Sequence, residues 1–385
     1  MRRDITPQHT KSLKRSIIVA NELQLDEETL NSLCKAAAQN RAFDLVVNNC
    51  QRFCTEILQR LVNNGYITRQ QFATLPEKDL PQLTGTTIPD FGRRFYIYAP
   101  STILKLGTDD GEAVMTALAH KILGKFVPNV SGLVRIANPP YEQGMLLERQ
   151  PGIPLVELWP TLDLTDQAKV TRSLVDLLVR MREPREELNY YGRPNGQPYV
   201  TPSEFGPHDT HPFCHTYQEW NASRARALHN FAGESGIDEA RIQELDQVQQ
   251  ETFAGKTSLS ELPVLTHGDL SDRNILIDPS TLQVTGLIDW ELANVAPAYF
   301  EYAVARLSGG HDPSWRKVLL EVLRQVLRIE CDRALYETDP KGDFTVSEKE
   351  DLFADAMAAW NSLVNVERSA QGYSDACYWT FQEGG

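Results

Sequence analysis

Apolar positions along the chain change their spacing twice, and these changes divide the sequence into three stretches. In the first stretch, residues 1–80, they recur at intervals of three and four, which predicts amphipathic helices. One of these helices is expected over about 45–63, and the run Asn63-Asn64-Gly65 is a natural end for it. We interpret residues 1–80 as a helical N-terminal extension whose role the pattern does not reveal.

The second stretch, residues 81–150, is rich in aromatic and β-branched residues, which favour strands. Ala99-Pro100 separates two such runs, so we expect an antiparallel hairpin there. The expected elements, in chain order, are strands over 93–98 and 101–106, a helix over about 111–125, and strands over 133–137 and 145–149. This order predicts a small α+β layer.

The third stretch, residues 151–385, is mostly helical in its pattern. Long helices are expected over about 165–182, 215–231, 237–252, 314–332 and 347–366. The exception is a pair of strands within about 264–289. The chain as a whole therefore belongs to the α+β class, with a small antiparallel sheet before a larger helical region.

Composition and charge exclude several classes of protein. Hydrophobic residues make up 41% and charged residues 23% of the 385 residues, which is the balance of a folded globular chain. The formal net charge of −14 repels phosphate backbones, so we expect no nucleic-acid partner. We also expect no membrane span, because no apolar run is long enough. The six scattered cysteines and the lack of a signal-peptide core favour a reducing, cytoplasmic location.

The strongest chemical signal in the chain is the run His267-Gly268-Asp269-Leu270, with Asn274 five residues after the aspartate. A turn follows, and the run Ile288-Asp289-Trp290 returns a second carboxylate toward the same end of the structure. Two carboxylates and one amide carbonyl can hold Mg²⁺ and leave one carboxylate as a base, as phosphoryl transfer requires. The alternative is a surface turn with solvated carboxylates, which the flanking apolar strands disfavour.

These motifs resemble those of the aminoglycoside phosphotransferase and choline kinase family, which shares a two-lobed protein-kinase-like fold. The resemblance is strong in a catalytic loop, residues 265–277, and in a metal-binding hairpin, residues 284–291. It implies a small N-lobe over residues 81–150 and a mostly helical C-lobe over residues 151–385. The kinase-like fold does not need the first eighty residues.

The resemblance also implies roles for the loop residues. Asp269 would be the catalytic base, His267 would brace the loop, and Asn274 and Asp289 would bind Mg²⁺. Ser271 completes the predicted catalytic set, and it stands where protein serine/threonine kinases usually carry lysine. A serine at this position favours a small-molecule acceptor.

A kinase-like N-lobe needs a strand lysine for the phosphates of ATP and a helix glutamate to orient that lysine. Lys105 ends an apolar strand, and Glu112 lies in the first turn of the predicted helix. The alternative for Glu112 is an acid that only complements the helix dipole. Around Glu148 and Gln150 the sequence is similar to the interlobe hinge of the family, where adenine bonds to the backbone.

Two features depart from this family pattern. The glycine-rich phosphate loop is degenerate, because Gly85-Thr86-Thr87 and Gly92-Arg93-Arg94 are the only candidates before the strand lysine. In the extension, the residues around Cys50 resemble the nucleophile motif of permuted papain-like hydrolases. A thiolate nucleophile needs a nearby base, and Cys50 falls on an apolar helix face, so a buried structural cysteine is the preferred interpretation.

Some acidic residues could face an amine-bearing acceptor, although solvated surface charges are the simpler interpretation. The candidates are Glu204, Asp209, Glu291 and Glu301. His208, His211 and His215 cluster beside Asp209, where a polar loop before a helix is favoured over a metal site.

Together these observations predict a phosphotransferase that uses ATP and Mg²⁺ and moves the γ-phosphate to a hydroxyl of a small molecule. The alternative is a catalytically silent nucleotide-binding or scaffold protein with the same fold. The identity of the acceptor and the oligomeric state cannot be read from the sequence, because function depends on the pocket rather than on the scaffold.

Overall fold

The computed structural model describes the chain from residue 87 to residue 373 with short gaps. The described segments are 87–88, 94–136, 142–202, 208–235, 239–254, 261–307, 311–339, 342 and 344–373. The predicted helical extension, Cys50 and Glu204 lie outside these segments, as do four of the six residues of the two glycine-loop candidates. Predictions about them stay predictions.

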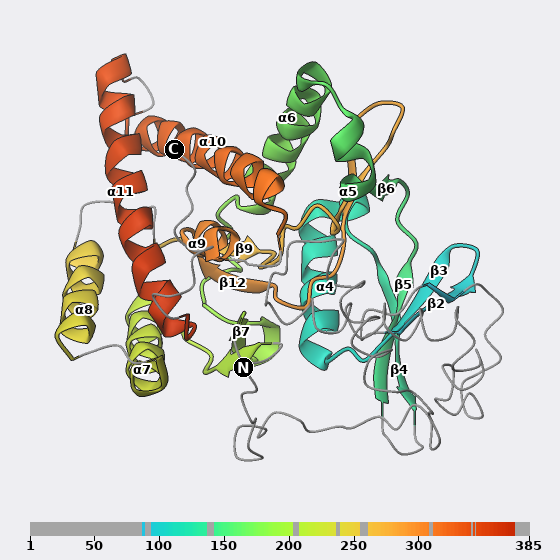
Figure 1. Cartoon of the computed structure of the whole chain (residues 1–385), viewed down its shortest axis with the longest axis horizontal. Coiled ribbons are helices and arrows are strands. Elements are labelled where there is room, and N and C mark those ends of the chain that lie inside the picture. The colour runs from blue at the N-terminus through green and yellow to red at the C-terminus, as the bar shows by residue number, and fades with distance from the viewer. Residues whose placement is uncertain are drawn as a thin grey trace, which may run out of the picture.

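An antiparallel sheet with one long helix against it forms the first part of the described fold (Figure 1). The strands run in the order β1-β2-β3-β5-β4. Their bounds are β1 (Thr87–Ile88), β2 (Arg94–Ala99), β3 (Thr102–Leu106), β4 (Val130–Ile136) and β5 (Glu142–Glu148), and the helix is α4 (Asp110–Leu123). The predicted hairpin and helix are confirmed. The last two strands begin three residues earlier than predicted, because their first residues, Val-Ser-Gly and Glu-Gln-Gly, include polar residues and a glycine that weaken the strand signal.

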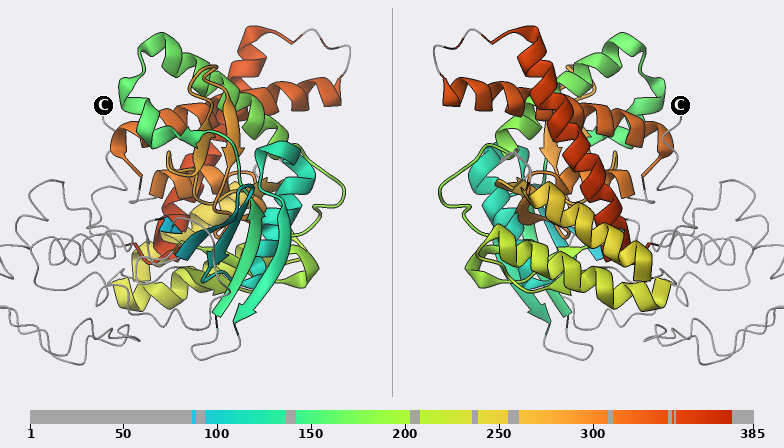
Figure 2. Two further views of the ribbon diagram at one scale, coloured as in Figure 1. Left: turned by 90° about the vertical axis from the view of Figure 1, so that its right-hand side faces the viewer. Right: turned by 90° about the vertical axis from the view of Figure 1, so that its left-hand side faces the viewer.

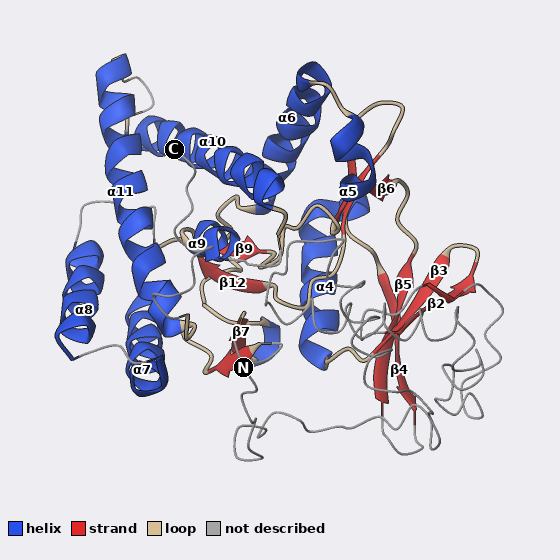
Figure 3. Ribbon diagram, viewed as in Figure 1, coloured by secondary structure: helices blue, strands red, loops and turns tan. Residues whose placement is uncertain are grey.

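Helices make up most of the remaining chain (Figure 3). They are α5 (Leu155–Leu158), α6 (Leu164–Met181), α7 (Tyr217–Ser235), α8 (Glu239–Ala254), α9 (Phe300–Leu307), α10 (Pro313–Thr338) and α11 (Val346–Ala370). The five long helices that the periodicity predicts are all present. Among the described residues, none of the helices combines the length and the apolar character that crossing a membrane requires.

Short strands connect the helices at the centre of the molecule. They are β6 (Ile153–Pro154), β7 (Tyr199–Thr201), β8 (Asp209–His211), β9 (Pro263–Thr266), β10 (Ile275–Ile277), β11 (Val284–Leu287) and β12 (Asn294–Pro297). The predicted strand pair is divided between two sheets, because β10 pairs with β11 whereas β9 pairs with β12. The sequence did not reveal β12, since Asn, Ala and Pro do not make a strand signal.

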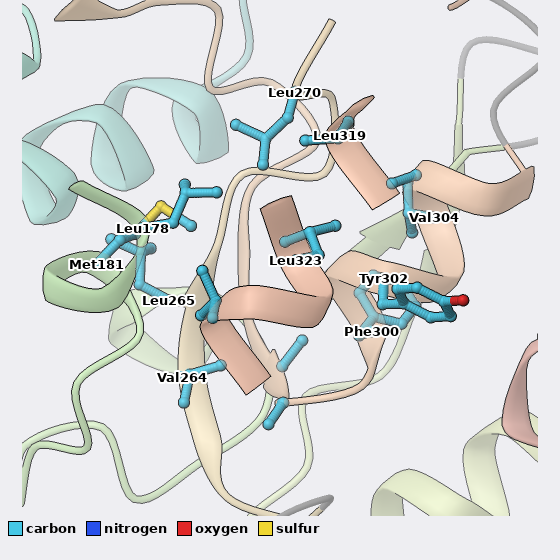
Figure 4. Close-up of a cluster of buried hydrophobic side chains, with 14 of the residues drawn as sticks. Leu178, Met181, Val264, Leu265, Leu270, Phe300, Tyr302, Val304, Leu319 and Leu323 are labelled. Carbon is cyan, nitrogen blue, oxygen red and sulfur yellow. The ribbon is translucent and has the colours of Figure 1, made fainter. Parts of the chain in front are cut away.

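The hydrophobic core surrounds β9 and the loop that follows it (Figure 4). Leu265 on β9 and Leu270 in the loop are fully buried. Helices α6, α9 and α10 contribute side chains such as Met181, Phe300 and Leu323 to the same core. Apolar side chains therefore hold the loop in place from several directions, which fixes the polar residues between them.

The last helix is held against the rest of the fold by a buried ion pair. In Figure 2, α11 packs across α7 and α8. Arg224 on α7 donates to Glu367 on α11, with an Nη2–Oε2 distance of 2.8 Å, and both side chains are buried. The Tyr299 hydroxyl donates to the same carboxylate over 3.0 Å. Because the charge of Glu367 is compensated from two sides, its burial is tolerated.

We expect Glu367→Ala to lower the free energy of unfolding by about 3–5 kcal/mol, because it leaves Arg224 buried without a counter-charge. Chemical denaturation measures this change. The matched control is Glu350→Ala, which removes the partner of Arg328 in an ion pair whose two side chains are half-exposed. The control should cost less than about 1 kcal/mol. Equal effects of the two substitutions would contradict the prediction.

Candidate active site

A buried lysine joins the helix that follows it to a hairpin that lies far along the sequence. Lys105 on β3 is only 1% exposed, and its ammonium group donates to Glu112 of α4 over 2.5 Å and to Asp289 over 2.6 Å. A lysine is found at this depth only when its charge is paired. The predicted pairing of Lys105 with Glu112 is present, and Asp289 is a second partner.

Asp289 takes a backbone conformation that most residues avoid. Its φ of +67° lies in the left-handed region, where aspartate is tolerated better than bulky residues. The chain turns there directly after β11. Trp290 is then buried against His267, with a ring-centroid distance of 4.5 Å. The turn and this packing hold the Asp289 carboxylate beside Lys105.

The predicted base, Asp269, has a hydrogen bond on each carboxylate oxygen. The side-chain amide of Asn274 donates to Oδ2 over 2.9 Å, and Nε2 of His311 lies 2.9 Å from Oδ1. Burial by itself would raise the pKa of Asp269, but the hydrogen bond from His311, together with the charge of Arg273, outweighs it and lowers the pKa to about 2. Asp269 is therefore ionised at neutral pH.

His267 makes hydrogen bonds to the backbone on both sides of its ring. Its Nδ1 accepts the backbone N–H of Asp269 over 3.3 Å, which leaves Nε2 as the donor to the carbonyl of Ile288 over 3.0 Å. Gly268, between His267 and Asp269, has φ +77°, and a Cβ at this position would lie 2.3 Å from the carbonyl oxygen of Leu292. Only glycine fits this close approach of two backbones.

Glu301 corrects one sequence-based expectation. It was a candidate for an acid that faces the acceptor, but it is buried under the catalytic loop. Its carboxylate accepts the backbone N–H groups of His267 over 2.5 Å and Gly268 over 3.1 Å. Burial raises the pKa of Glu301 to about 7 despite these two hydrogen bonds. It supports the loop from below.

Ser271 is also fully buried. Its carbonyl accepts the backbone N–H of Asn274 over 3.0 Å, and the preceding carbonyl, of Leu270, accepts the indole N–H of Trp315 over 3.0 Å. In this conformation Ser271 shapes the loop rather than facing a substrate.

Oxygen ligands for a metal gather beside the buried lysine. Glu112, Asp289 and Glu291 each offer a carboxylate oxygen, and these oxygens lie within 4.8 Å of one another. The carbonyl of Asn274 accepts the N–H of Ile288 over 3.0 Å, which holds Asn274 close to the same hairpin. Hard oxygen ligands of this kind suit Mg²⁺. The structure therefore adds Glu291, expected to face an acceptor, to the neighbourhood of the predicted ligands.

In the predicted hinge, Glu148 to Gln150, two backbone N–H groups already donate to neighbouring backbone carbonyls. The N–H of Glu148 donates to the carbonyl of Asn129 over 2.9 Å, and the N–H of Arg149 donates to that of Ser101 over 2.8 Å. An adenine ring bound at this hinge would therefore have to form its hydrogen bonds with the hinge carbonyl groups or with the N–H of Gln150.

The sequence did not reveal Arg193, which connects α4 to the metal-binding hairpin. Its buried guanidinium donates to the carbonyl of Ala293 over 3.1 Å and to that of Glu291. It also lies 3.7 Å from the carboxylate of Asp109, whose side chain caps α4. Gly111 leaves room for this arginine, because a Cβ there would collide with it. No motif surrounds Arg193, so only its spatial position reveals it.

The histidine cluster has the structure of a polar support rather than a metal site. His211 on β8 makes hydrogen bonds with Thr201 and Arg224, and burial followed by the charge of Arg224 lowers its pKa to about 3. Within the described segments, only the carboxylate cluster beside Lys105 has potential ligand atoms close enough together to hold a metal. Asp209 lies on the same short strand, β8.

We expect Glu301→Gln to change how stability depends on pH. The folded-state pKa of Glu301, about 7, lies above the ordinary value of 4.5. The stability that this group contributes is therefore fully present below pH 4.5 and is lost as the pH rises through 7. Urea denaturation between these pH values should show the wild type losing stability relative to Glu301→Gln. The control Glu321→Gln, at an exposed position on α10, should show no such trend, and parallel curves for all three would contradict the prediction.

One curated relative matches part of this chain. An aminoglycoside 3'-phosphotransferase of Streptomyces fradiae is 34% identical over 110 residues, which cover 22% of this chain and 41% of that protein. The chain thus spans less than half the length of this curated relative.

Solved structures with similar folds are also aminoglycoside phosphotransferases. A thermostable mutant of APH(4)-Ia, in a ternary complex with ADP and hygromycin B, has 14% identity and a TM-score of 0.47, with coverage of 77% of this chain and 94% of that chain. APH(3'')-Id from Streptomyces rimosus has 16% identity and a TM-score of 0.36, with coverage of 81% and 98%.

The family model described as "Phosphotransferase enzyme family" matches residues 110–334. This match includes the helix of Glu112, the catalytic loop and the metal-binding hairpin. Because it extends over more than half of the sequence, the chain belongs to the phosphotransferase enzyme family, as the motifs implied.

Proposed function

We propose that this protein transfers the γ-phosphate of ATP, with Mg²⁺, to a hydroxyl group of a small molecule. The observation that carries the proposal is one connected set of buried and half-buried polar contacts. It joins Lys105, Asp289, Asn274 and Asp269 through the hairpin and the catalytic loop. These residues come from a strand, the catalytic loop and the hairpin, and phosphoryl transfer requires this combination of a cation, metal ligands and a base.

Asp269 is the group that we assign to the acceptor hydroxyl. As the hydroxyl oxygen bonds to the γ-phosphorus and the bond to the leaving ADP oxygen breaks, the hydroxyl proton passes to the carboxylate. A carboxylate with a pKa of about 2 is a weak base. This suits a loose transition state, in which orientation of the hydroxyl matters more than the strength of the base.

Lys105 and the carboxylates beside it would form the phosphate end of the site. The Lys105 ammonium, held by Glu112, would bind phosphate oxygens. Asp289, Glu291 and the amide oxygen of Asn274 would hold Mg²⁺, which supplies charge neutralisation at the phosphates when it is bound. Arg193 would keep the hairpin and α4 at a fixed separation.

An amine-bearing acceptor fits the charge of the molecule, because the net charge of −14 attracts cations. The relative from Streptomyces fradiae and the solved structures are named for aminoglycosides, which supports this class. The cytoplasmic location predicted from the sequence suits such a substrate. The intact base, lysine and metal ligands favour an enzyme over the alternative of a silent scaffold.

We expect Mg·ATP to raise the thermal unfolding midpoint of the wild type by several degrees. A ligand at a hundred times its dissociation constant adds about 2.7 kcal/mol of stability. Asp289→Asn should abolish the magnesium-dependent part of the shift, because the substitution removes a metal carboxylate. Asp176→Asn, at an exposed position of α6, is the matched control and should keep the full shift. No shift in the wild type at millimolar Mg·ATP would refute the nucleotide site.

We expect Asp269→Asn to lower turnover by about 10²–10⁴-fold, the usual contribution of a general base. The assay is ADP release from Mg·ATP with a panel of amine-bearing alcohols, including hygromycin B, streptomycin and choline. The thermal shift with Mg·ATP should remain, because this substitution leaves the phosphate end unchanged. Undiminished turnover in the variant would rule out Asp269 as the base.

A further inference from the structure

His311 lies outside every motif of the sequence, yet it contacts the proposed base. It precedes Asp312, the N-cap of α10, and its side chain is 1% exposed. Nε2 lies 2.9 Å from Oδ1 of Asp269, which is 42 residues earlier in the chain. A buried histidine in this position needs an explanation that the packing of α10 alone does not give.

The other ring nitrogen decides how His311 is protonated. Nδ1 is buried, and within the described part of the chain it has no hydrogen-bond partner. A proton placed only on Nδ1 would leave a buried donor unsatisfied, and it would turn the lone pair of Nε2 toward the carboxylate. The arrangement with the proton on Nε2 avoids both costs. His311 is therefore a donor to Asp269.

The donation completes a clamp on the carboxylate. Asn274 holds one oxygen of Asp269, and His311 holds the other. Both donors are anchored, because Asn274 is bonded to the hairpin through Ile288 and His311 stands at the start of α10. With both oxygens held, the carboxylate plane cannot rotate, and the lone pairs that remain point in fixed directions.

We propose that His311 is a positioning residue, which fixes the Asp269 carboxylate so that its free lone pair meets the acceptor hydroxyl. The proposal rests on the proposed function for its kinetic consequence. His311 does not touch the substrate or take the proton in this scheme. Loss of this hydrogen bond should lower kcat, because a small misplacement of a reacting group costs up to about 10²-fold in rate.

The kinetic test compares three substitutions that differ in where they place a hydrogen-bond donor. His311→Gln can place an amide N–H near the position of Nε2, whereas His311→Asn places it near Nδ1 and His311→Phe removes the donor while keeping a ring. We expect His311→Phe and His311→Asn to lower kcat by about 10–100-fold without changing KM for ATP. His311→Gln should restore most of the lost rate.

The assay is ADP release with the acceptors named above or, if none reacts, with water as the acceptor. Thermal unfolding with and without Mg·ATP shows that each variant is folded and binds nucleotide. A merely structural role would lower stability in step with activity and would not distinguish Gln from Asn. Wild-type kcat in His311→Phe, or equal losses in Gln and Asn, would overturn the proposal.

A second measurement does not depend on activity. Long-range ¹H–¹⁵N NMR of histidine side chains reports which ring nitrogens carry protons, and the signals absent from His311→Gln assign the residue. We expect a protonated Nε2 in the wild type. An unprotonated Nε2 would overturn the proposal even if the enzyme is active. If neither acceptor nor water supports ADP release, the proposed function fails, while the NMR result still decides whether His311 donates to Asp269.

Discussion

The burial of one lysine charge is the constraint on which the rest of the structure depends. An ammonium group removed from water is costly unless counter-charges surround it. Lys105 meets this condition with Glu112 from α4 and Asp289 from the hairpin, so the sheet, the helix and the hairpin must come together for any of them to be stable. Arg193 extends the same principle, because it connects the cap of α4 to the backbone after Asp289.

The catalytic loop has little regular structure of its own, and its shape is imposed by groups that follow it in the chain. Glu301 receives two backbone N–H groups of the loop, and Trp315 donates to the carbonyl of Leu270. Backbone groups that are buried without a secondary-structure partner must be satisfied by side chains. The two helices α9 and α10 are thus part of the site, although they contribute no motif to it.

The surroundings shift the pKa values of two carboxylates at this loop, the half-buried Asp269 and the buried Glu301, in opposite directions. Asp269 has His311 beside it, and its pKa falls to about 2, whereas Glu301 meets mainly neutral N–H groups and its pKa rises to about 7. The same kind of side chain therefore gives an ionised carboxylate that can accept a proton, Asp269, and a carboxylate that supports the loop, Glu301. Environment, rather than residue type, separates the two roles.

The sequence by itself determined the α+β class, the long helices and the loop and hairpin of Asp269 and Asp289, because these depend on periodicity and on residues close together in the chain. The pairing of Lys105 with Glu112 could also be predicted, because the resemblance to a kinase-like N-lobe implies it. The tertiary structure alone decided that β9 pairs with β12, that Glu301 lies under the loop and that His311 and Arg193 reach the site. Contacts between distant segments depend on packing and on the compensation of buried charge, and neither leaves a local pattern in the sequence.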